Sequence, residues 1–144
     1  MLYPSDATLS GQELRLRQEY FFTAASLQDI VQRHLKRFGD LKQLHKHASI
    51  QLNDTHPSIA IAELMRLLVD VHGLPWADSW SITVKTFSYT NHTLLPEALE
   101  TWSVHPLEQV LPRHLQIIYR INAEHIEAAR QKSPYGFAES LAAI

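Results

Sequence analysis

The sequence contains no cysteine and only 4 glycines among its 144 residues. The absence of cysteine excludes disulfide bonds and thiolate metal sites, and it is compatible with a reducing compartment. The scarcity of glycine argues against a glycine-rich phosphate loop, and the chain has neither a G-x-S-x-G elbow nor a zincin motif. The sequence therefore contains none of these three signatures of nucleotide-binding proteins and hydrolases.

The chain also lacks a large excess of charge and a long apolar run. Its formal net charge is −2 and its pI is near 6.5, so no global field attracts nucleic acid or an anionic membrane. No apolar run approaches the roughly 20 residues of a membrane span, and the first residues do not resemble a signal peptide. We expect a cytoplasmic protein with no nucleic-acid or membrane partner. Its hydrophobic content of 45% fits one compact core.

Helix signals dominate the first third of the chain. Ser10 and Glu13 have the spacing of a capping box, and Gly39 is typical of a helix C-terminus. These signals predict one long helix over about residues 11–38. The polar segment 40–47 shows no clear period and is expected to form an irregular connector.

Two strand-and-loop units are predicted in the middle of the chain. Residues 48–53 read as a short strand, followed by a loop and a helix over about 58–72. A helix ending near residue 85 precedes a second strand over 87–90, and the intervening helix favours a parallel pairing. We therefore predict a mostly helical α/β fold with two short parallel strands and long helices.

Further helical faces follow from the spacing of apolar residues and proline. Pro106 and Pro112 each suit a first helical position, which predicts a short helix and then a long one reaching about residue 132. The residues expected to face inward are Ile61, Leu64, Met65, Leu68 and Val71 in the middle helix, and Leu115, Ile118, Asn122, His125 or Ile126, and Ala129 in the last.

Polar residues follow both predicted strands, at the position where open α/β sheets usually bind ligands. Asp54 and His56 come after the first strand, and His92 comes after the second. One interpretation is a metal site built on these three residues, as in a small metal-dependent hydrolase. The residue types alone favour the other interpretation, in which Asp54 caps the next helix and each histidine is hydrogen-bonded within its loop.

Glu97 and Glu100 lie three residues apart, so both carboxylates share one face of a helical turn. With Asp54 they could line a pocket for a polyhydroxy ligand, or act as an acid and base pair as in glycoside hydrolysis. A solvated helix face is the more common outcome for such a pair. A carbohydrate-binding module without catalytic activity is a further alternative.

Four blocks of sequence resemble the α-glucan phosphorylases, the family of glycogen, starch and maltodextrin phosphorylases. The blocks comprise residues 13–21, residues 52–57 with 63–66, residues 89–93 with 97–100, and residues 111–118. The resemblance extends from residue 2 to about residue 122 and is nearest to bacterial members.

The resemblance implies a GT-B type fold with two Rossmann-like domains facing a cleft. Residues 1–144 would form an interior part of the amino-terminal domain, without the carboxyl-terminal cofactor-binding domain. The implied reaction is phosphorolysis of α-1,4-glucan by inorganic phosphate, which releases glucose 1-phosphate and depends on pyridoxal phosphate. No lysine of this chain matches the cofactor-binding motif, so we expect the isolated chain to be inactive. The parent enzyme is expected to be a homodimer, and the fragment is expected to self-associate.

The resemblance also implies roles for individual residues. His92 would be the catalytic histidine that contacts the glucosyl unit near its 6-hydroxyl. Asp54, His56, Glu97 and Glu100 would belong to the polar lining beside the anomeric face. No metal site is implied.

Regulatory positions differ from those of the animal enzymes. Asp6 would be the acidic residue on the gate loop over the cleft, but Ala7 replaces an asparagine, so a gate controlled by glucose is not expected. Gln32 and Arg33 stand where those enzymes have two arginines that hold the phosphate of AMP. Loss of one arginine removes a bidentate contact, so AMP activation is expected to be weak or absent.

Overall fold

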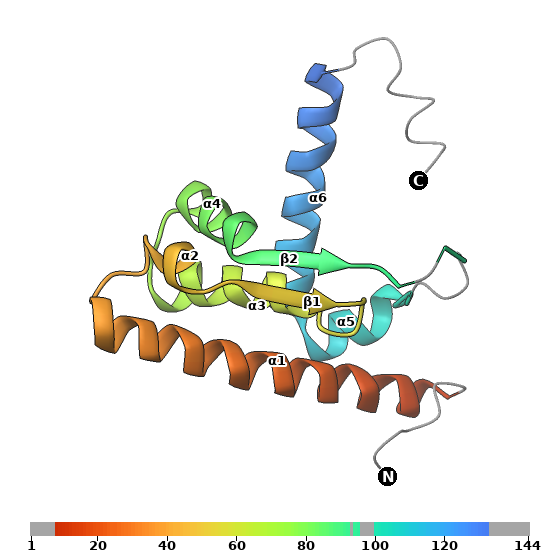
Figure 1. Cartoon of the computed structure of the whole chain (residues 1–144). Coiled ribbons are helices and arrows are strands. Elements are labelled where there is room, and N and C mark those ends of the chain that lie inside the picture. The colour runs from red at the N-terminus through yellow and green to blue at the C-terminus, as the bar shows by residue number, and fades with distance from the viewer. Residues whose placement is uncertain (1–7, 93, 96–99, 133–144) are drawn as a thin grey trace.

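A computed structural model of the chain describes residues 8–92, 94, 95 and 100–132. Figure 1 shows a helical body with two short parallel strands side by side. In chain order the elements are α1 (Leu9–Phe38), α2 (Leu44–His47), β1 (Ile50–Asn53), α3 (Ile59–Arg66), the π-helical segment η1 (Leu67–Val71), α4 (Trp76–Thr86), β2 (Phe87–Thr90), α5 (Val104–Val110) and α6 (Pro112–Lys132). This arrangement confirms the predicted α/β class.

Helix α1 begins earlier than the capping box predicts. Thr8 has an extended backbone, and its hydroxyl oxygen accepts a hydrogen bond from the Gly11 N–H at 3.1 Å. Thr8 is therefore the N-cap, and the assignment of this role to Ser10 was wrong. At the other end Gly39 has φ 71° and donates its N–H to the Leu35 carbonyl at 2.9 Å, which confirms the predicted cap.

The segment predicted to be an irregular connector instead carries helix α2. Leu41 and Leu44 are buried there, with 3% and 0% of their surface exposed. Leu41 begins the turn before α2 and Leu44 is the first residue of the helix; the Leu44 N–H donates to the Leu41 carbonyl at 3.0 Å, so this tight turn brings both side chains to the core. The prediction failed because the polar residues between them conceal this pattern.

The two strands pair in parallel, from Ile50 opposite Phe87 to Asn53 opposite Thr90. This pairing confirms the prediction made from the intervening helix. Both strands end at the same edge of the sheet, so the loops that start at residues 54 and 91 begin side by side. The strand ends therefore bring together segments that lie 37 residues apart in sequence.

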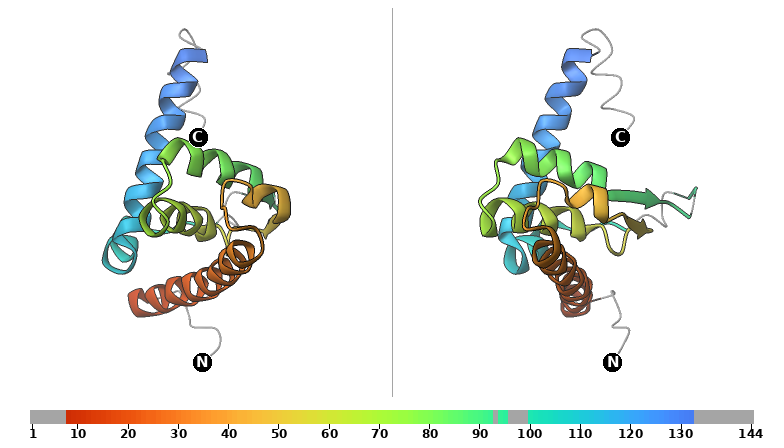
Figure 2. Two further views of the ribbon diagram at one scale, coloured as in Figure 1. Left: turned by 90° about the vertical axis from the view of Figure 1, so that its left-hand side faces the viewer. Right: turned by 60° about the vertical axis from the view of Figure 1, so that its left-hand side comes forward.

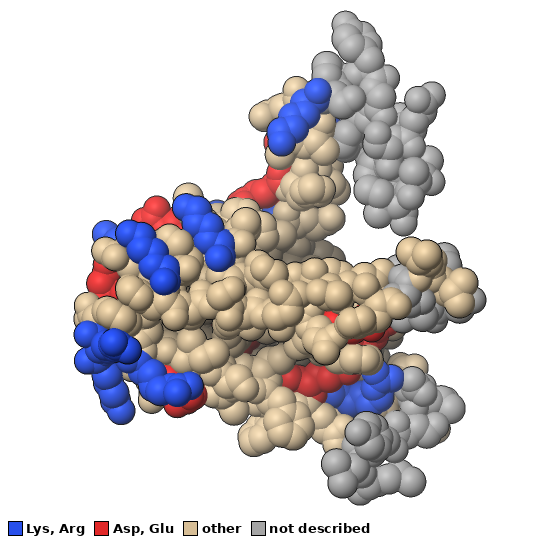
Figure 3. Space-filling model, in the orientation of Figure 1, with Lys and Arg blue, Asp and Glu red and all other residues tan. Residues whose placement is uncertain are grey.

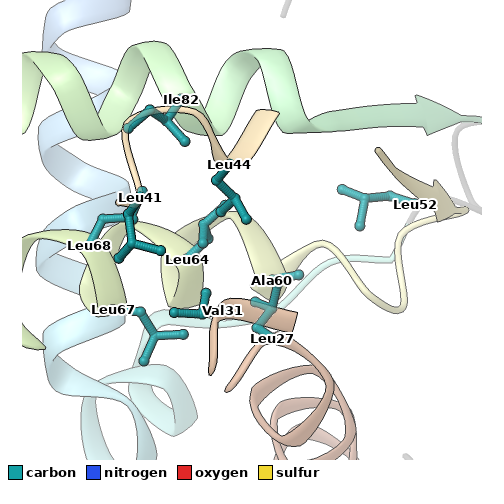
Figure 4. Packing of buried hydrophobic residues seen from close by; sticks show 10 residues of the cluster. All are labelled: Leu27, Val31, Leu41, Leu44, Leu52, Ala60, Leu64, Leu67, Leu68 and Ile82. Atoms are coloured by element: carbon teal, nitrogen blue, oxygen red, sulfur yellow. The ribbon is translucent and has the colours of Figure 1, made fainter. Parts of the chain in front are cut away.

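Helix α3 is the centre of the packing and contacts α1, α4 and α6. Figure 4 shows that leucine, isoleucine, valine and alanine side chains from α1, α2, β1, α3, η1 and α4 meet in one core. Full burial of a leucine such as Leu64 or Leu68 contributes about 1.5–3 kcal/mol to folding. These two residues confirm the predicted inward face.

The π-helical segment η1 changes the end of that face. The His72 N–H donates to the Leu67 carbonyl, five residues earlier, at 3.0 Å. Leu67 and Leu68 are both buried, whereas Val71 is 56% exposed. The wider turn rotates Val71 away from the core, so the prediction that it faces inward was wrong.

Helix α6 begins at Pro112 as predicted, and its first half contacts the body, where Ile121 packs against the core and Arg120 and Glu124 contact Trp76 of α4. His114, Leu115 and Ile117 are buried, whereas Ile118 and Asn122 are exposed. Figures 1 and 2 show the later turns extending beyond the rest of the structure, so the predicted inward face is wrong there. Pro106 is the third residue of α5 rather than its first. Within the described ranges, no helix combines the length and apolarity needed to cross a bilayer.

Candidate functional site

The loop after β1 is shaped by Asp54. Its backbone has φ 67°, and its N–H donates to the Thr90 carbonyl at 2.9 Å, which extends the strand pairing by one bond. The Asp54 carboxylate accepts a hydrogen bond from the Thr55 N–H at 2.8 Å. Helix α3 starts only at Ile59, so Asp54 stabilises a tight turn. The prediction that Asp54 caps this helix was wrong.

His92 lies at the same edge of the sheet. Its Nε2 donates a hydrogen bond to the side-chain oxygen of Asn53, the last residue of β1. In the tautomer that makes this bond with its single ring proton on Nε2, Nδ1 is left as an acceptor. His92 is otherwise exposed, which makes its ring accessible to a ligand.

A cavity of about 500 Å³ opens beside these loops. Its walls come from α1, the loop after β1, α3, residues 100 and 102, α5 and α6. The polar and aromatic residues in its lining are Glu19, Thr55, His56, Ser58, Glu100, Trp102, Asn122 and His125. The structure thus places His56 and Glu100 together in the lining, whereas Asp54 and His92 lie outside it.

Four charged or titratable side chains meet at this cavity, and we call them the open cluster: Arg15, Glu19, His56 and Glu100. The His56 Nδ1 lies 3.8 Å from Glu100 Oε1 and 3.9 Å from Glu19 Oε1. Arg15 forms a salt bridge with each carboxylate, at 3.5 Å for Glu19. Figure 3 shows acidic and basic side chains side by side near the first half of α1.

In the open cluster, two carboxylates face only one guanidinium. Burial, and then the negative charge of Glu100, raise the pKa of Glu19 to about 7, while the Arg15 guanidinium opposes this rise. No pattern in the sequence distinguished Glu19, which lies on the polar side of a long helix. Its partners are 37 and 81 residues away in sequence, so only the fold shows that they converge.

A second group, the buried cluster, joins α3 to α6 and consists of Glu63, Arg66 and His114. Glu63 is fully buried and accepts hydrogen bonds from Arg66 at 2.7 and 2.8 Å and from His114 Nε2 at 2.7 Å. Burial alone would raise the pKa of the Glu63 carboxyl, but these bonds lower it below its ordinary value. The edge of the Tyr20 ring packs against His114, with ring centroids 5.0 Å apart. The one signal in the sequence was a glutamate within an apolar helical stretch.

The remaining predicted residues are less informative. Asp6 and Glu97 lie outside the described residues, as does the predicted helical turn around Glu97. Gln32 and Arg33 are exposed near the end of α1, where lysine and arginine side chains gather (Figure 3). Arg33 pairs with Asp29 and lines a cavity at that end, but Gln32 does not line it.

The metal interpretation also needs correction. In the part of the chain that the structure describes, the side chains with convergent ligand atoms are Glu19, His56 and Glu100. Asp54 and His92 do not join His56 in that group. Asp54 instead accepts a hydrogen bond from Thr55 in its own loop, and His92 bonds to Asn53 at the end of the neighbouring strand β1.

Whether this chain can bind pyridoxal phosphate depends on the positions of its lysines. A lysine amine is needed to hold the cofactor aldehyde. All five lysines are exposed, and none lines the 500 Å³ cavity, the cavity at the end of α1 or the small cavity beside β2: Lys36, Lys42, Lys46, Lys85 and Lys132. The residues present therefore do not fit this group.

Comparison with known proteins now places the chain in a class. Residues 1–143 match the carbohydrate phosphorylase family, and the chain belongs to that family. It is 54% identical over 134 residues to the glycogen phosphorylase of Synechocystis sp., a match that covers 93% of this chain and 16% of the relative. It is 55% identical over 135 residues to the liver form from Bos taurus, covering 88% of this chain and 16% of the relative. The glycogen phosphorylase of Chlamydia trachomatis is 54% identical over 134 residues, again 93% of this chain and 16% of the relative.

These matches confirm the resemblance found in the sequence. They also set its extent, because the chain spans about a sixth of the length of these relatives. The parts of a phosphorylase that this chain contains are the strand-end loops, the open cluster and the helices that hold them.

Proposed function

We propose that the chain forms one wall of the glucosyl site of an enzyme that phosphorolyses α-1,4-glucan to glucose 1-phosphate. The observation that carries this proposal is the position of His92, held by Asn53 at the carboxyl edge of two parallel strands in a chain of the phosphorylase family. Ligands of open α/β sheets bind at such an edge.

His92 would contact the glucosyl unit near its 6-hydroxyl. Because Nε2 donates to Asn53, Nδ1 presents a lone pair that accepts a hydrogen bond from a sugar hydroxyl. The bond to Asn53 also fixes the ring orientation before the sugar arrives, which lowers the entropic cost of positioning. His92 is the catalytic candidate of this chain because it would touch the glucosyl unit that is transferred to phosphate.

The cavity offers complementary contacts to a polyhydroxy ligand. The His56 imidazole and the Glu100 carboxylate provide polar groups for hydroxyls, and Trp102 provides an apolar ring for a sugar face. By position in the family, Asp54 and Glu97 would add polar groups beside the anomeric face, and Asp6 would lie on the gate loop over the cleft.

The chain would not complete the site alone. None of its lysines is placed to hold pyridoxal phosphate, so the cofactor and the basic residues for inorganic phosphate would come from other parts of the parent enzyme. We further propose a cytoplasmic homodimer for that parent. Gln32, in place of an arginine, would leave it with a weak or absent response to AMP.

An activity assay tests the proposal of an incomplete site. The purified chain is incubated with maltoheptaose, inorganic phosphate and pyridoxal phosphate, and a full-length bacterial phosphorylase serves as the positive control. We expect no glucose 1-phosphate from the chain. Release above that of a His92→Ala variant would show that this chain completes an active site and would overturn this part of the proposal.

A binding experiment tests the sugar contacts independently of catalysis. We expect glucose at high concentration to shift the amide and imidazole NMR signals of His92 and its neighbours. Asn53→Ala should reduce these shifts, because the ring loses its fixed orientation, whereas the exposed and distant His72→Ala should leave them unchanged. Shifts confined to α6, or shifts unaffected by His92→Ala, would contradict the proposed role.

A further inference from the structure

We propose that Glu19, His56 and Glu100 form a binding site for a divalent transition metal ion, with Zn²⁺ the best match. The three side chains come from α1, the loop after β1, and the segment before α5, and they meet at the mouth of the 500 Å³ cavity. The inference rests on their geometry and donor types.

The distances are close to those that a metal requires. The three ligand atoms lie within 4.8 Å of one another, and the two separations from His56 Nδ1 are 3.8 and 3.9 Å. In a tetrahedral zinc site with bonds of about 2.0–2.1 Å, ligand atoms lie about 3.3 Å apart. His56 is 63% exposed, so a small rotation of its side chain can close the difference.

The donor set selects the class of ion. One imidazole nitrogen with two carboxylate oxygens suits Zn²⁺ and related transition metals, whereas Ca²⁺ and Mg²⁺ prefer oxygen ligands alone. Three protein ligands leave a fourth coordination position on the side of the cavity. That position would hold a water molecule or a hydroxyl group of a bound ligand.

The charges of the site also favour a cation. Two carboxylates share the single guanidinium of Arg15. Arg15 contacts the same Oε1 atoms that face His56, so the ion would take the place of the guanidinium between the two carboxylates. The Arg15 guanidinium also lies 5.7 Å from the centre of the Trp102 ring, which provides a partner when it moves aside.

Such an ion would affect the cavity directly. A metal on His56 and Glu100 occupies groups that the proposed function assigns to the sugar, so metal and sugar would compete. That consequence rests on the proposed function, but metal binding itself does not. Measuring the two separately therefore distinguishes failure of one proposal from failure of the other.

The experiment is a calorimetric titration of the full 144-residue chain with Zn²⁺, together with Co²⁺ absorption as a report of coordination geometry. We expect one ion per chain and the visible absorption of a four-coordinate site. His56→Ala and Glu100→Gln should each weaken binding by roughly tenfold or more, because each removes a ligand. Glu19→Gln should have a similar effect.

Two control variants separate this site from other histidines. His72→Ala removes an exposed histidine elsewhere and should leave the affinity unchanged. His47→Ala tests the end of α1, where the rings of His34 and His47 lie 5.5 Å apart. Circular dichroism establishes that each variant is folded. Equal affinity in His56→Ala and the unmodified chain, loss of binding only in His47→Ala, or no binding at all would overturn the proposal.

Discussion

The open cluster and the buried cluster contain the same kinds of side chain, but their carboxylates respond in opposite directions. In the buried cluster one carboxylate, Glu63, accepts hydrogen bonds from both a guanidinium and an imidazole, and its pKa is lowered. In the open cluster two carboxylates share one guanidinium, and the pKa of Glu19 rises to about 7.

The difference shows that burial alone does not decide the charge state of a carboxyl. Glu63 is the more deeply buried residue, with none of its side chain exposed, whereas 16% of the Glu19 side chain is exposed. The ratio of donors to carboxylates reverses the order expected from burial. A satisfied cluster stabilises the packing of α3 on α6, and an unsatisfied one leaves a place for a proton or another cation.

The largest effect is expected from Glu63→Ala. This change leaves Arg66 and His114 without their shared partner, so the free energy of unfolding should fall by about 3–5 kcal/mol. Urea denaturation at neutral pH measures the loss. Glu108→Ala, an exposed residue on α5, serves as a matched control and should change stability by no more than about 0.5 kcal/mol. A similar small change for Glu63→Ala would remove the distinction between the two clusters.

A smaller effect with a specific pH dependence is expected from Glu19→Gln. The folded pKa of about 7 lies above the ordinary value of 4.5, so between these values the folded chain keeps a proton that the unfolded chain has lost. Stability from Glu19 should therefore be fully present below about pH 4.5 and fall as the pH rises through 7. The slope is at most about 1.4 kcal/mol per pH unit for one proton.

Denaturation of the two proteins from pH 5 to pH 8 tests this prediction. The carboxamide cannot ionise, so Glu19→Gln should lose the downward slope that Glu19 gives the unmodified chain. Glu100, Arg15 and His56 face Glu19, and Glu100→Gln should reduce the same slope because it removes the neighbouring negative charge. Identical pH profiles for all three proteins would contradict the assignment.

The smallest effect is expected from the ion pair between Asp70 of η1 and Arg113 of α6. Both of its hydrogen bonds measure 2.8 Å, and the bonds from Arg113 lower the pKa of Asp70, but both side chains are partly exposed. A double-mutant cycle with Asp70→Asn and Arg113→Gln should give a coupling energy below about 1 kcal/mol, decreasing with added salt. A coupling energy as large as the loss of about 3–5 kcal/mol expected for Glu63→Ala would show that hydrogen-bond geometry matters more than burial.

Much of the fold followed from local signals in the sequence. Gly39 ended α1 because a left-handed cap favours glycine, and the change of period after Thr86 placed β2 correctly. The failures at α2 and in the later turns of α6 share a cause, since both depended on tertiary contacts that local sequence does not record. Helix α2 forms because Leu41 and Leu44 reach the core, and α6 lacks an inward face where it leaves the body.

The candidate site was less predictable. The predicted parallel pairing put both strand ends at one edge of the sheet, where Asn53 and His92 meet, but the hydrogen bond between these two residues was not predicted. The pairing of His56 with Glu100 was suggested only by the family resemblance, and the contribution of Glu19 was not predicted. Convergence of residues from α1 and from two distant loops is set by tertiary packing, which periodicity and capping do not encode.

The π-helical segment η1 affects how the continuous helix formed by α3 and η1 tolerates changes in length. A π turn contains one residue more than an α turn, so η1 is equivalent to a single-residue insertion in a continuous helix. Because the wider turn absorbs the extra residue, the residues on either side keep nearly the phase of an uninterrupted α-helix. Deleting one residue within Leu67–Val71 would therefore restore regular α-helical bonding and leave the turn at Gly73 close to its present direction. The segment η1 is thus where this helix tolerates the loss of one residue without displacing α4.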